Sequence, residues 1–306
     1  MSELGQRPLA QGEPATPGKK PRSGIAALAV AGLVVAAVVV VTGPAAAPDE
    51  GHAPARGAPT APVTTPTSVP PPQPTPIAAR QVSPDALARL PKATTFGTVT
   101  NAPADPRPGD APPGMVVHPR RTVPVFTAPG GRPIAALPAT QLGSDTWLPV
   151  LDEQPGWLRV LLPARPNGAT GWLHHDTAYL RIAHTPYRIE VDRARFTLRL
   201  YRDGATIGRW TVGVGKPAAE TPAGRTFVLA SIRDTKATFS DIVLPLGAHS
   251  DTYTTYGGGP GTVGIHTWPT SDAFGTASSD GCIRVPPAAL AELSTTVPLG
   301  TPVLIR

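Results

Sequence analysis

One cysteine and one histidine have the residue types and the spacing to do chemistry together. Cys282 is the only cysteine of the chain and lies in SSDGCIRV (278–285), while His266 lies in GIHTWP (264–269). A thiol is a weak nucleophile until it loses its proton, and an imidazole can accept that proton. We therefore predict that Cys282 is a nucleophile and that His266 activates it. The alternative for a lone cysteine is a small buried hydrophobic residue.

The residues around Cys282 are of types that suit acyl transfer. Gly281 lets the backbone approach a substrate closely, and the amides of Gly281 and Cys282 are candidates for an oxyanion hole. Arg284 could anchor the loop or bind a substrate carboxylate through two parallel contacts. Apolar runs adjoin both His266 and Cys282, so each is predicted at a strand end. His249 is interpreted as a solvated loop residue.

The composition limits the architecture and the partners. A chain of 306 residues is long enough for about two domains, but 41 prolines are too many for one compact globule, so part of the chain is predicted to be linker. The net charge of +6 is scattered, without a basic stripe interleaved with aromatic residues, so no nucleic-acid partner is expected. A single cysteine excludes a cysteine-based zinc cluster, and no phosphate loop or metal-ligand motif occurs. No cofactor or metal is therefore expected.

The N-terminal part reads as a membrane anchor followed by a spacer. Residues 24–43 (GIAALAVAGLVVAAVVVVTG) are uncharged and long enough to span a bilayer as a single helix. Basic residues gather within 1–23, which predicts a cytoplasmic tail and an extracytoplasmic remainder of the chain. A cleaved signal peptide is the alternative, because Ala45–Ala47 resembles a cleavage site. Residues 44–114 are rich in proline and alanine and are predicted to be a disordered linker.

Two regions with strand-like patterns follow the spacer, so the chain is predicted to be mainly β. Within the linker, Ser83 is predicted to cap a short helix that ends near Leu90. Residues 115–183 contain short alternating runs separated by turn residues, which predicts a small all-β barrel. The expected strands are 122–126, 133–137, 146–151, 156–163 and 170–174.

The PGWLRVLLPARPNGATGWL run resembles a bacterial SH3-like domain, a module associated with cell-wall enzymes. That resemblance covers roughly 118–182. Trp157 and Trp172 are interpreted as core residues, with contact to wall glycan as the alternative.

The C-terminal region is predicted to be mostly β as well. Residues 187–201 alternate around a turn at 192–195, which predicts a hairpin, and PVLIR predicts a final strand after one helix in PPAALAELSTTV. The long segment 233–261 is predicted to be a lid with glycine hinges. The residues expected to line the substrate cleft are Tyr253, Tyr256, Thr267 and Trp268.

The order of these segments, from VGVGKPAAETPAGRTF through GIH to SSDGCIR, resembles the L,D-transpeptidase (YkuD) catalytic domain over 186–306. The resemblance implies a β-sandwich in which Cys282 attacks the third-residue carbonyl of a peptidoglycan stem tetrapeptide. The terminal D-alanine leaves, a thioester forms, and an amine of a neighbouring stem resolves it into a 3→3 cross-link. His266 matches the proton acceptor, and carbapenems acylate the cysteine in such enzymes. Ser279, Gly281 and Arg284 match the flanking motif positions.

Two positions depart from the family pattern. Asp280 stands where histidine is usual, and an unpaired carboxylate there would raise the pKa of Cys282 unless Arg284 paired with it. Thr267-Trp268 follows the histidine where Gly-Thr is common, which alters the shape of the pocket.

The function expected from these features is that of a membrane-anchored transferase. It would cross-link peptidoglycan and so contribute to wall organisation and cell shape. Two alternatives remain open at this point: an L,D-carboxypeptidase that uses the same site with water, and a catalytically degenerate wall-binding protein.

Overall fold

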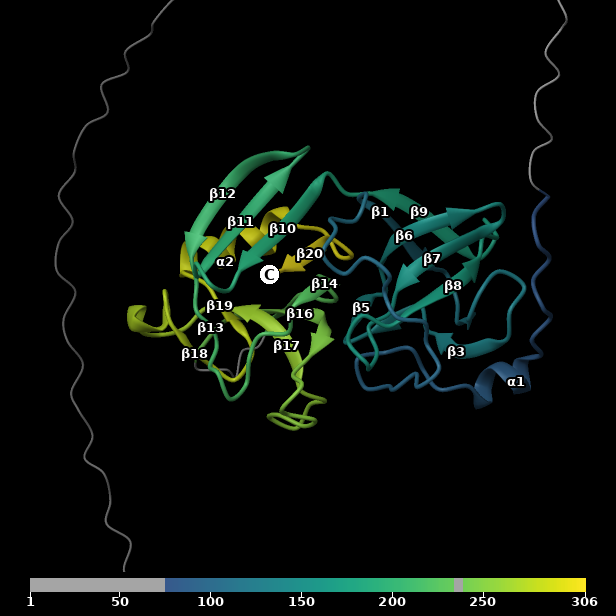
Figure 1. Ribbon diagram of the computed structural model, residues 1–306, viewed down its shortest axis with the longest axis horizontal. Coiled ribbons are helices and arrows are strands. Elements are labelled where there is room, and N and C mark those ends of the chain that lie inside the picture. The colour runs from purple at the N-terminus through teal and green to yellow at the C-terminus, as the bar shows by residue number, and fades with distance from the viewer. Residues whose placement is uncertain (1–74, 234–238) are drawn as a thin grey trace, which may run out of the picture. The chain divides into compact units, whose positions relative to one another are not determined.

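The computed structural model describes residues 75–233 and 239–306, which are mainly β as the sequence predicts (Figure 1). The predicted cytoplasmic tail, the predicted span at 24–43 and the first part of the predicted linker lie outside the described residues. Among the residues that are described, no helix has the length and apolar character needed to cross a membrane.

The first half of the described chain forms a seven-stranded sheet in the order β3-β2-β8-β7-β6-β1-β9. All five predicted strands are present, and the sequence missed β1 and β9, which pair with each other. The SH3-like assignment stays a prediction. The strands are β1 (Met115–Pro119), β2 (Val123–Phe126), β3 (Pro133–Leu137), β6 (Leu148–Gln154), β7 (Trp157–Leu161), β8 (Thr170–His174) and β9 (Leu180–His184), with a separate pair β4 (Thr140–Gln141) and β5 (Ser144–Asp145).

Tryptophan packing in this sheet follows the sequence interpretation. Trp157 is fully buried and Trp172 is 6% exposed, and both pack with Phe126. The Trp157 indole also donates a 2.7 Å hydrogen bond to the Ile77 carbonyl. The two tryptophans are therefore core residues, and Trp157 ties the preceding segment to the sheet.

The C-terminal end of the predicted linker belongs to the fold. Helix α1 (Pro84–Arg89) begins as expected, because the Ser83 hydroxyl accepts a hydrogen bond from the Ala86 amide. Beyond it, Ala93 and Val99 are buried in the same core as the sheet, and the Val99 amide donates to a carbonyl in the β7–β8 loop. The prediction of a spacer up to residue 114 is therefore wrong over its last part. Proline-rich composition did not distinguish a free spacer from a chain segment that packs along a sheet.

A buried ion pair joins this segment to the C-terminal half. Asp105 and Arg225 are 2% and 3% exposed, and the Arg225 Nε donates to Asp105 Oδ2 at 2.7 Å. Removing one partner leaves an uncompensated buried charge, so Asp105→Ala is expected to lower the free energy of unfolding by about 3–5 kcal/mol. Urea unfolding checks this. Asp110→Ala, which removes a carboxylate from an exposed pair with Arg107, is the control and should cost about 1 kcal/mol or less. Equal losses in the two variants would contradict the assignment.

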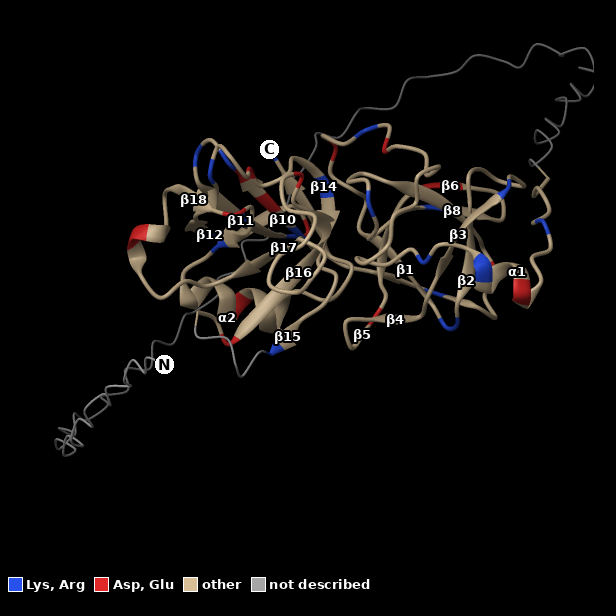
Figure 2. Cartoon of the chain, turned by 90° about the horizontal axis from the view of Figure 1, so that it is seen from below, with Lys and Arg blue, Asp and Glu red and all other residues tan. Residues whose placement is uncertain are grey.

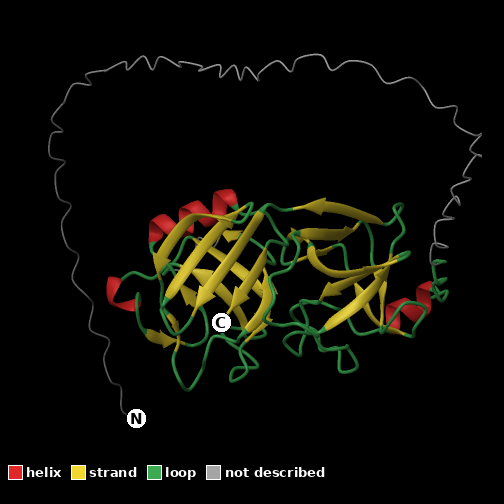
Figure 3. Ribbon diagram, turned by 45° about the horizontal axis from the view of Figure 1, so that its top comes forward, coloured by secondary structure: helices red, strands yellow, loops and turns green. Residues whose placement is uncertain are grey.

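The second half contains two sheets with one core between them (Figure 3). The predicted hairpin is confirmed as β10 and β11, paired from Tyr187–Arg202 to Asp192–Thr197, and the predicted last strand is β20. The five-stranded sheet consists of β12 (Ala205–Thr211), β11 (Thr197–Arg202), β10 (Tyr187–Asp192), β20 (Pro302–Ile305) and β14 (Gly224–Phe227). The four-stranded sheet consists of β15 (Ile232–Arg233), β16 (Ile242–His249), β17 (Thr262–His266) and β19 (Ile283–Arg284).

Shorter elements complete this half. Strands β13 (Val214–Gly215) and β18 (Ala277–Ser279) form a parallel pair, and a short 3-10 helix, η1, covers Ser271–Ala273. Helix α2 (Pro287–Thr296) matches the predicted helix, and its buried Ala289, Leu290 and Leu293 join the shared core. Lysine and arginine are interspersed with aspartate and glutamate over the described residues (Figure 2), as the scattered charge of the sequence predicts.

Candidate active site

A parallel strand pair brings His266 and Cys282 to one face of the four-stranded sheet. In the β17–β19 register Ile265 lies opposite Ile283, and both side chains are fully buried in the core. Because side chains alternate along a strand, His266 and Cys282 belong to the other face. Cys282 falls beside Gly264, whose backbone hydrogen-bonds to the thiol. Both residues are at strand ends, as predicted.

His266 is held in a single tautomer. Its Nδ1 lies 2.7 Å from the Thr267 carbonyl, which can only accept, so Nδ1 carries the proton and Nε2 keeps a free lone pair. The Thr267 amide in turn donates to the Ser240 hydroxyl at 3.1 Å. The ring packs edge-on against Phe239 at 4.9 Å, and His266 is 6% exposed. Burial is the main cause that lowers the pKa of His266, so the imidazole is neutral at pH 7 and can act as a base.

Cys282 is a half-buried thiol in its protonated form. Burial raises its pKa most, and the Asp280 charge raises it further. The Gly264 hydrogen bond and the Arg284 charge lower the pKa but do not offset burial. The resting pair is therefore a neutral thiol and a neutral imidazole, so Cys282 depends on His266 for deprotonation when a substrate is attacked.

Side-chain hydrogen bonds shape the loop that carries Cys282. The buried Ser279 hydroxyl donates to the Cys282 carbonyl at 2.6 Å and accepts from the Gly281 amide at 3.1 Å. The Thr221 hydroxyl donates to the Gly281 carbonyl at 2.9 Å. Gly281 has φ 112°, which favours glycine. Because its amide is engaged by Ser279, Gly281 is not a free oxyanion donor, contrary to the sequence prediction, and the Cys282 amide remains the candidate.

Asp280 pairs with a residue that the sequence analysis did not consider. Its Oδ1 lies 2.6 Å from Lys216 Nζ and accepts from the Tyr253 hydroxyl at 3.4 Å, while its Oδ2 accepts from the Tyr256 hydroxyl at 3.1 Å. The expected partner, Arg284, makes no ion pair with Asp280 among the described residues. The Lys216 hydrogen bond is the main cause that lowers the pKa of Asp280, so the carboxylate is charged at pH 7.

Arg284 is fixed mainly by its backbone and by an aromatic ring. Its amide and carbonyl exchange hydrogen bonds with Gly213, and its guanidinium lies 3.7 Å above the centre of the Trp268 ring. Nη1 donates to the Ser278 hydroxyl at 3.3 Å, while the buried Nε has no partner among the described atoms. This arrangement fits the predicted anchoring role of Arg284 and places Trp268 beside the histidine.

The segment 233–261, predicted as a lid, contains a strand in its middle part. Within the described part, residues 242–249 form β16, and Gly247 is buried against Phe227 rather than acting as a hinge. His249 is fully buried, and its Nε2 lies 2.7 Å from the Thr95 carbonyl, so the interpretation as a solvated residue is wrong. The loop that remains spans 250–261 and carries both tyrosines.

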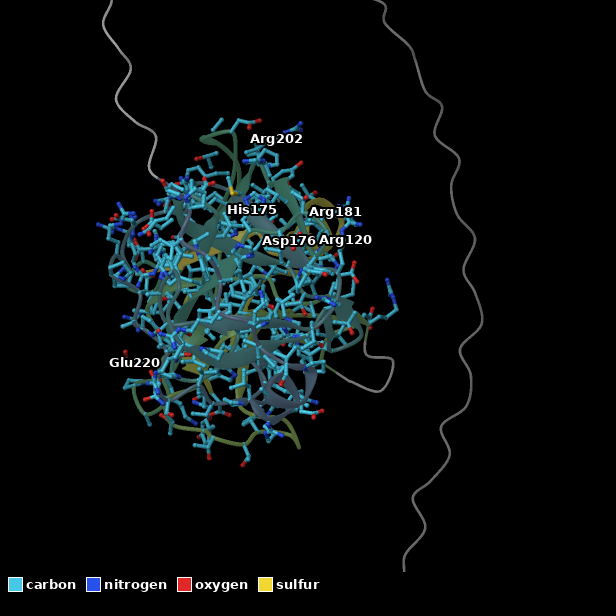
Figure 4. All side chains as sticks on the ribbon, turned by 90° about the vertical axis from the view of Figure 1, so that its right-hand side faces the viewer. Arg120, His175, Asp176, Arg181, Arg202 and Glu220 are labelled. Atoms are coloured by element: carbon cyan, nitrogen blue, oxygen red, sulfur yellow. The ribbon has the colours of Figure 1, made fainter. Side chains whose placement is uncertain are left out.

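Sequence reasoning missed two residues that support the site, Lys216 and Thr221. Both lie in the VGVGKPAAETPAGRTF run, which carried the family resemblance without assigned roles. The Lys216 amide donates to the Ser279 carbonyl at 2.9 Å, which fixes this segment beside the cysteine loop. Glu220, labelled in Figure 4, pairs with Arg193 at 3.0 Å, and the same Arg193 Nη1 donates to the Thr221 carbonyl.

Two cavities lie elsewhere in the described chain. One of about 420 Å³ is lined by residues 78–82 and by strands of the seven-stranded sheet, and one of about 210 Å³ lies at the Asp105–Arg225 pair. Within the described residues, no three His, Cys, Asp or Glu side chains are grouped to hold a metal ion.

Comparison with known proteins finds matches for the C-terminal part of the chain. Residues 186–305 match the family model of the L,D-transpeptidase catalytic domain, YkuD. The YkuD protein of Bacillus licheniformis, named as an L,D-transpeptidase, is 31% identical over 120 residues, which are 39% of this chain and 66% of that protein. The YkuD protein of Bacillus subtilis is 29% identical over 121 residues, with 40% and 66% covered. The match thus spans just under two thirds of the length of each relative.

Solved L,D-transpeptidase structures also match in part. The catalytic domain of the E. faecium L,D-transpeptidase is 28% identical, with 40% of this chain and 100% of that chain covered at a TM-score of 0.32. An L,D-transpeptidase from Mycobacterium smegmatis is 15% identical, with 49% and 90% covered at a TM-score of 0.34. These low scores add nothing to the family match. On the sequence comparisons, residues 186–305 of this chain are similar to the YkuD family of L,D-transpeptidase catalytic domains.

Proposed function

We propose that this protein is a peptidoglycan L,D-transpeptidase that forms 3→3 cross-links through a thioester on Cys282. The observation that carries the proposal is the β17–β19 register, which puts a neutral histidine base and the single cysteine on one face within a region similar to the YkuD family. The substrate class is the tetrapeptide stem, and no cofactor takes part in the proposed reaction.

In the proposed first step the thiol of Cys282 is deprotonated by Nε2 of His266 as the sulfur attacks the third-residue carbonyl. The carbon–sulfur bond forms and the carbon–nitrogen bond to D-alanine breaks, with the proton passing from His266 to the departing amine. The Cys282 amide supports the negative oxygen of the intermediate.

In the second step an acceptor amine attacks the thioester. The acceptor amine gives up a proton to Nε2 of His266 as the new carbon–nitrogen bond forms, the carbon–sulfur bond breaks, and His266 passes that proton to the Cys282 sulfur. The donor stem is then joined to the acceptor stem, and the enzyme is restored to its resting protonation state.

We further propose that residues 24–43 anchor the protein in the cell membrane with the N-terminus in the cytoplasm. The length of the uncharged run and the basic residues before it support this orientation. The catalytic domain would then face the wall, where its substrate is found.

The reaction is tested by incubating the full-length protein with a disaccharide tetrapeptide and analysing the products by mass spectrometry. A cross-linked dimer with release of D-alanine is the expected result. A disaccharide tripeptide alone would replace the proposal with an L,D-carboxypeptidase, because water would then resolve the thioester. No product from folded protein would favour a wall-binding role.

A further inference from the structure

The acidic residue next to the cysteine loop gathers three side chains from two other segments. Lys216 follows β13, and Tyr253 and Tyr256 come from the loop 250–261, yet all three contact the Asp280 carboxylate. Lys216 and Asp280 are 41% and 30% exposed, so the cluster lies at the surface of the site rather than in the core. Because exposed ion pairs contribute little to the free energy of unfolding, the main effect of this cluster is to position the loop 250–261 against the cysteine loop.

The loop 250–261 is held at its base independently of Asp280. The Ser250 amide donates to the Gly261 carbonyl at 2.8 Å. The guanidinium of Arg165, from the β7–β8 loop, donates to the carbonyls of Ser250, Tyr253 and Pro260 at 3.1, 3.2 and 3.0 Å. The base of the loop is therefore fixed by four hydrogen bonds to backbone carbonyls.

The tip of the loop has no such support. Gly257 and Gly258 both adopt positive φ, and the bonded pair Tyr256–Gly259 closes a tight turn around them. Tyr256 is 57% exposed, and its only side-chain hydrogen bond among the described residues goes to Asp280. Burial and this hydrogen bond raise the pKa of Tyr256, so the hydroxyl stays a donor at neutral pH.

We propose that Asp280 is a positioning residue: with Lys216 it latches the tip of the loop 250–261, through Tyr253 and Tyr256, onto the loop that carries Cys282. The latch forms one wall of the cleft and so strengthens binding of the stem peptide. This inference rests on the proposed function. The ion pair with Lys216 offsets part of the carboxylate's negative charge beside a cysteine that must become a thiolate.

Two measurements distinguish the positioning role of Asp280 from the effect of its charge on the pKa of Cys282. The first is KM and kcat for release of D-alanine from a stem tetrapeptide by the full-length protein. The second is the pH dependence of Cys282 alkylation by iodoacetamide, a reagent too small to need the cleft wall. Because the Asp280 charge raises the pKa of Cys282, Asp280→Ala and Asp280→Asn should both shift alkylation toward lower pH.

The latch predicts that these two variants differ in KM. Asp280→Ala removes the acceptor and should raise KM about tenfold, while Asp280→Asn keeps an acceptor oxygen for a tyrosine and should raise KM only about threefold. The double variant Tyr253→Phe with Tyr256→Phe should raise KM about tenfold and leave the alkylation profile in place. Tyr201→Phe, which loses a hydrogen bond to Glu190 on the hairpin, is the control and should match wild type.

An unchanged KM in the double tyrosine variant would overturn the latch, as would equal KM values for Asp280→Ala and Asp280→Asn. The double variant keeps the test decisive if Asp280→Ala does not fold. If Cys282 of the wild type is alkylated but the protein releases no D-alanine, the proposed function itself fails. If the wild type releases D-alanine and the variants have an unchanged KM, only the latch fails.

Discussion

Cys282→Ala is expected to lower the release of D-alanine from a stem tetrapeptide by about 10⁴-fold or more, because removing the nucleophile leaves only binding and oxyanion stabilisation. The half-buried thiol is the single sulfhydryl of the chain, so no neighbouring cysteine can replace it. Release of D-alanine by the full-length protein, followed by chromatography, measures the effect.

Ser278→Ala provides the matched control for Cys282→Ala. Ser278 lies in the same motif, is exposed, and contacts Thr276 and Arg284 through its hydroxyl. The rate of D-alanine release by Ser278→Ala should stay within about threefold of wild type, since both hydrogen bonds of this hydroxyl are exposed. Full release of D-alanine by Cys282→Ala would contradict the assigned nucleophile.

His266→Ala is expected to slow acylation about 10²–10⁴-fold at pH 7, the usual contribution of a positioned general base. The thiol has a raised pKa and little thiolate of its own at this pH. Since burial lowers the pKa of His266, wild-type acylation should fall to half of its plateau rate at a pH below the ordinary histidine value of about 6.5.

The pH profile of His266→Ala distinguishes a base from a structural residue. Without the imidazole, the rate should rise about tenfold per pH unit until the thiol itself ionises. His184→Ala, which removes an exposed histidine from β9, should keep the wild-type profile. A variant that is slow at every pH by the same factor would show that His266 does not act as the base.

Local patterns in the sequence predicted the elements that depend on local rules. The hairpin at 187–202 was predictable because apolar residues alternate on both sides of a four-residue turn. Helix α1 was predictable because Ser83 supplies a cap and Pro84 fits the first turn. Strands β1 and β9 were missed because they lie far apart in the sequence and pair with each other at one edge of the sheet, which no local pattern reports.

The site was predictable in its chemistry but not in its contacts. Cys282 and His266 were found from residue type and motif, and the parallel register of β17 and β19 brings them to one face. The partner of Asp280 could not be read from the sequence, because Lys216 is brought to it by the β13–β18 pair from a distant segment. Likewise, the Ser279 hydroxyl occupies the Gly281 amide, which only the loop geometry reveals.

The end of the spacer was misjudged for a related reason. Residues 91–114 have the composition of a free linker, but their few apolar residues fall where the seven-stranded sheet can bury them, as at Ala93 and Val99. Asp105 then meets Arg225 across the fold and stays buried because it is paired. The composition of a segment does not reveal such single residues, although they decide whether the segment packs against the sheet.

The central claim is that Cys282 forms the acyl-enzyme, and intact-mass analysis of the full-length protein with a carbapenem tests it most directly. A single adduct on wild type that maps to the peptide containing Cys282, is absent from Cys282→Ala and forms slowly on His266→Ala is the predicted result. No adduct on folded wild-type protein, or an adduct that persists in Cys282→Ala, would contradict the claim.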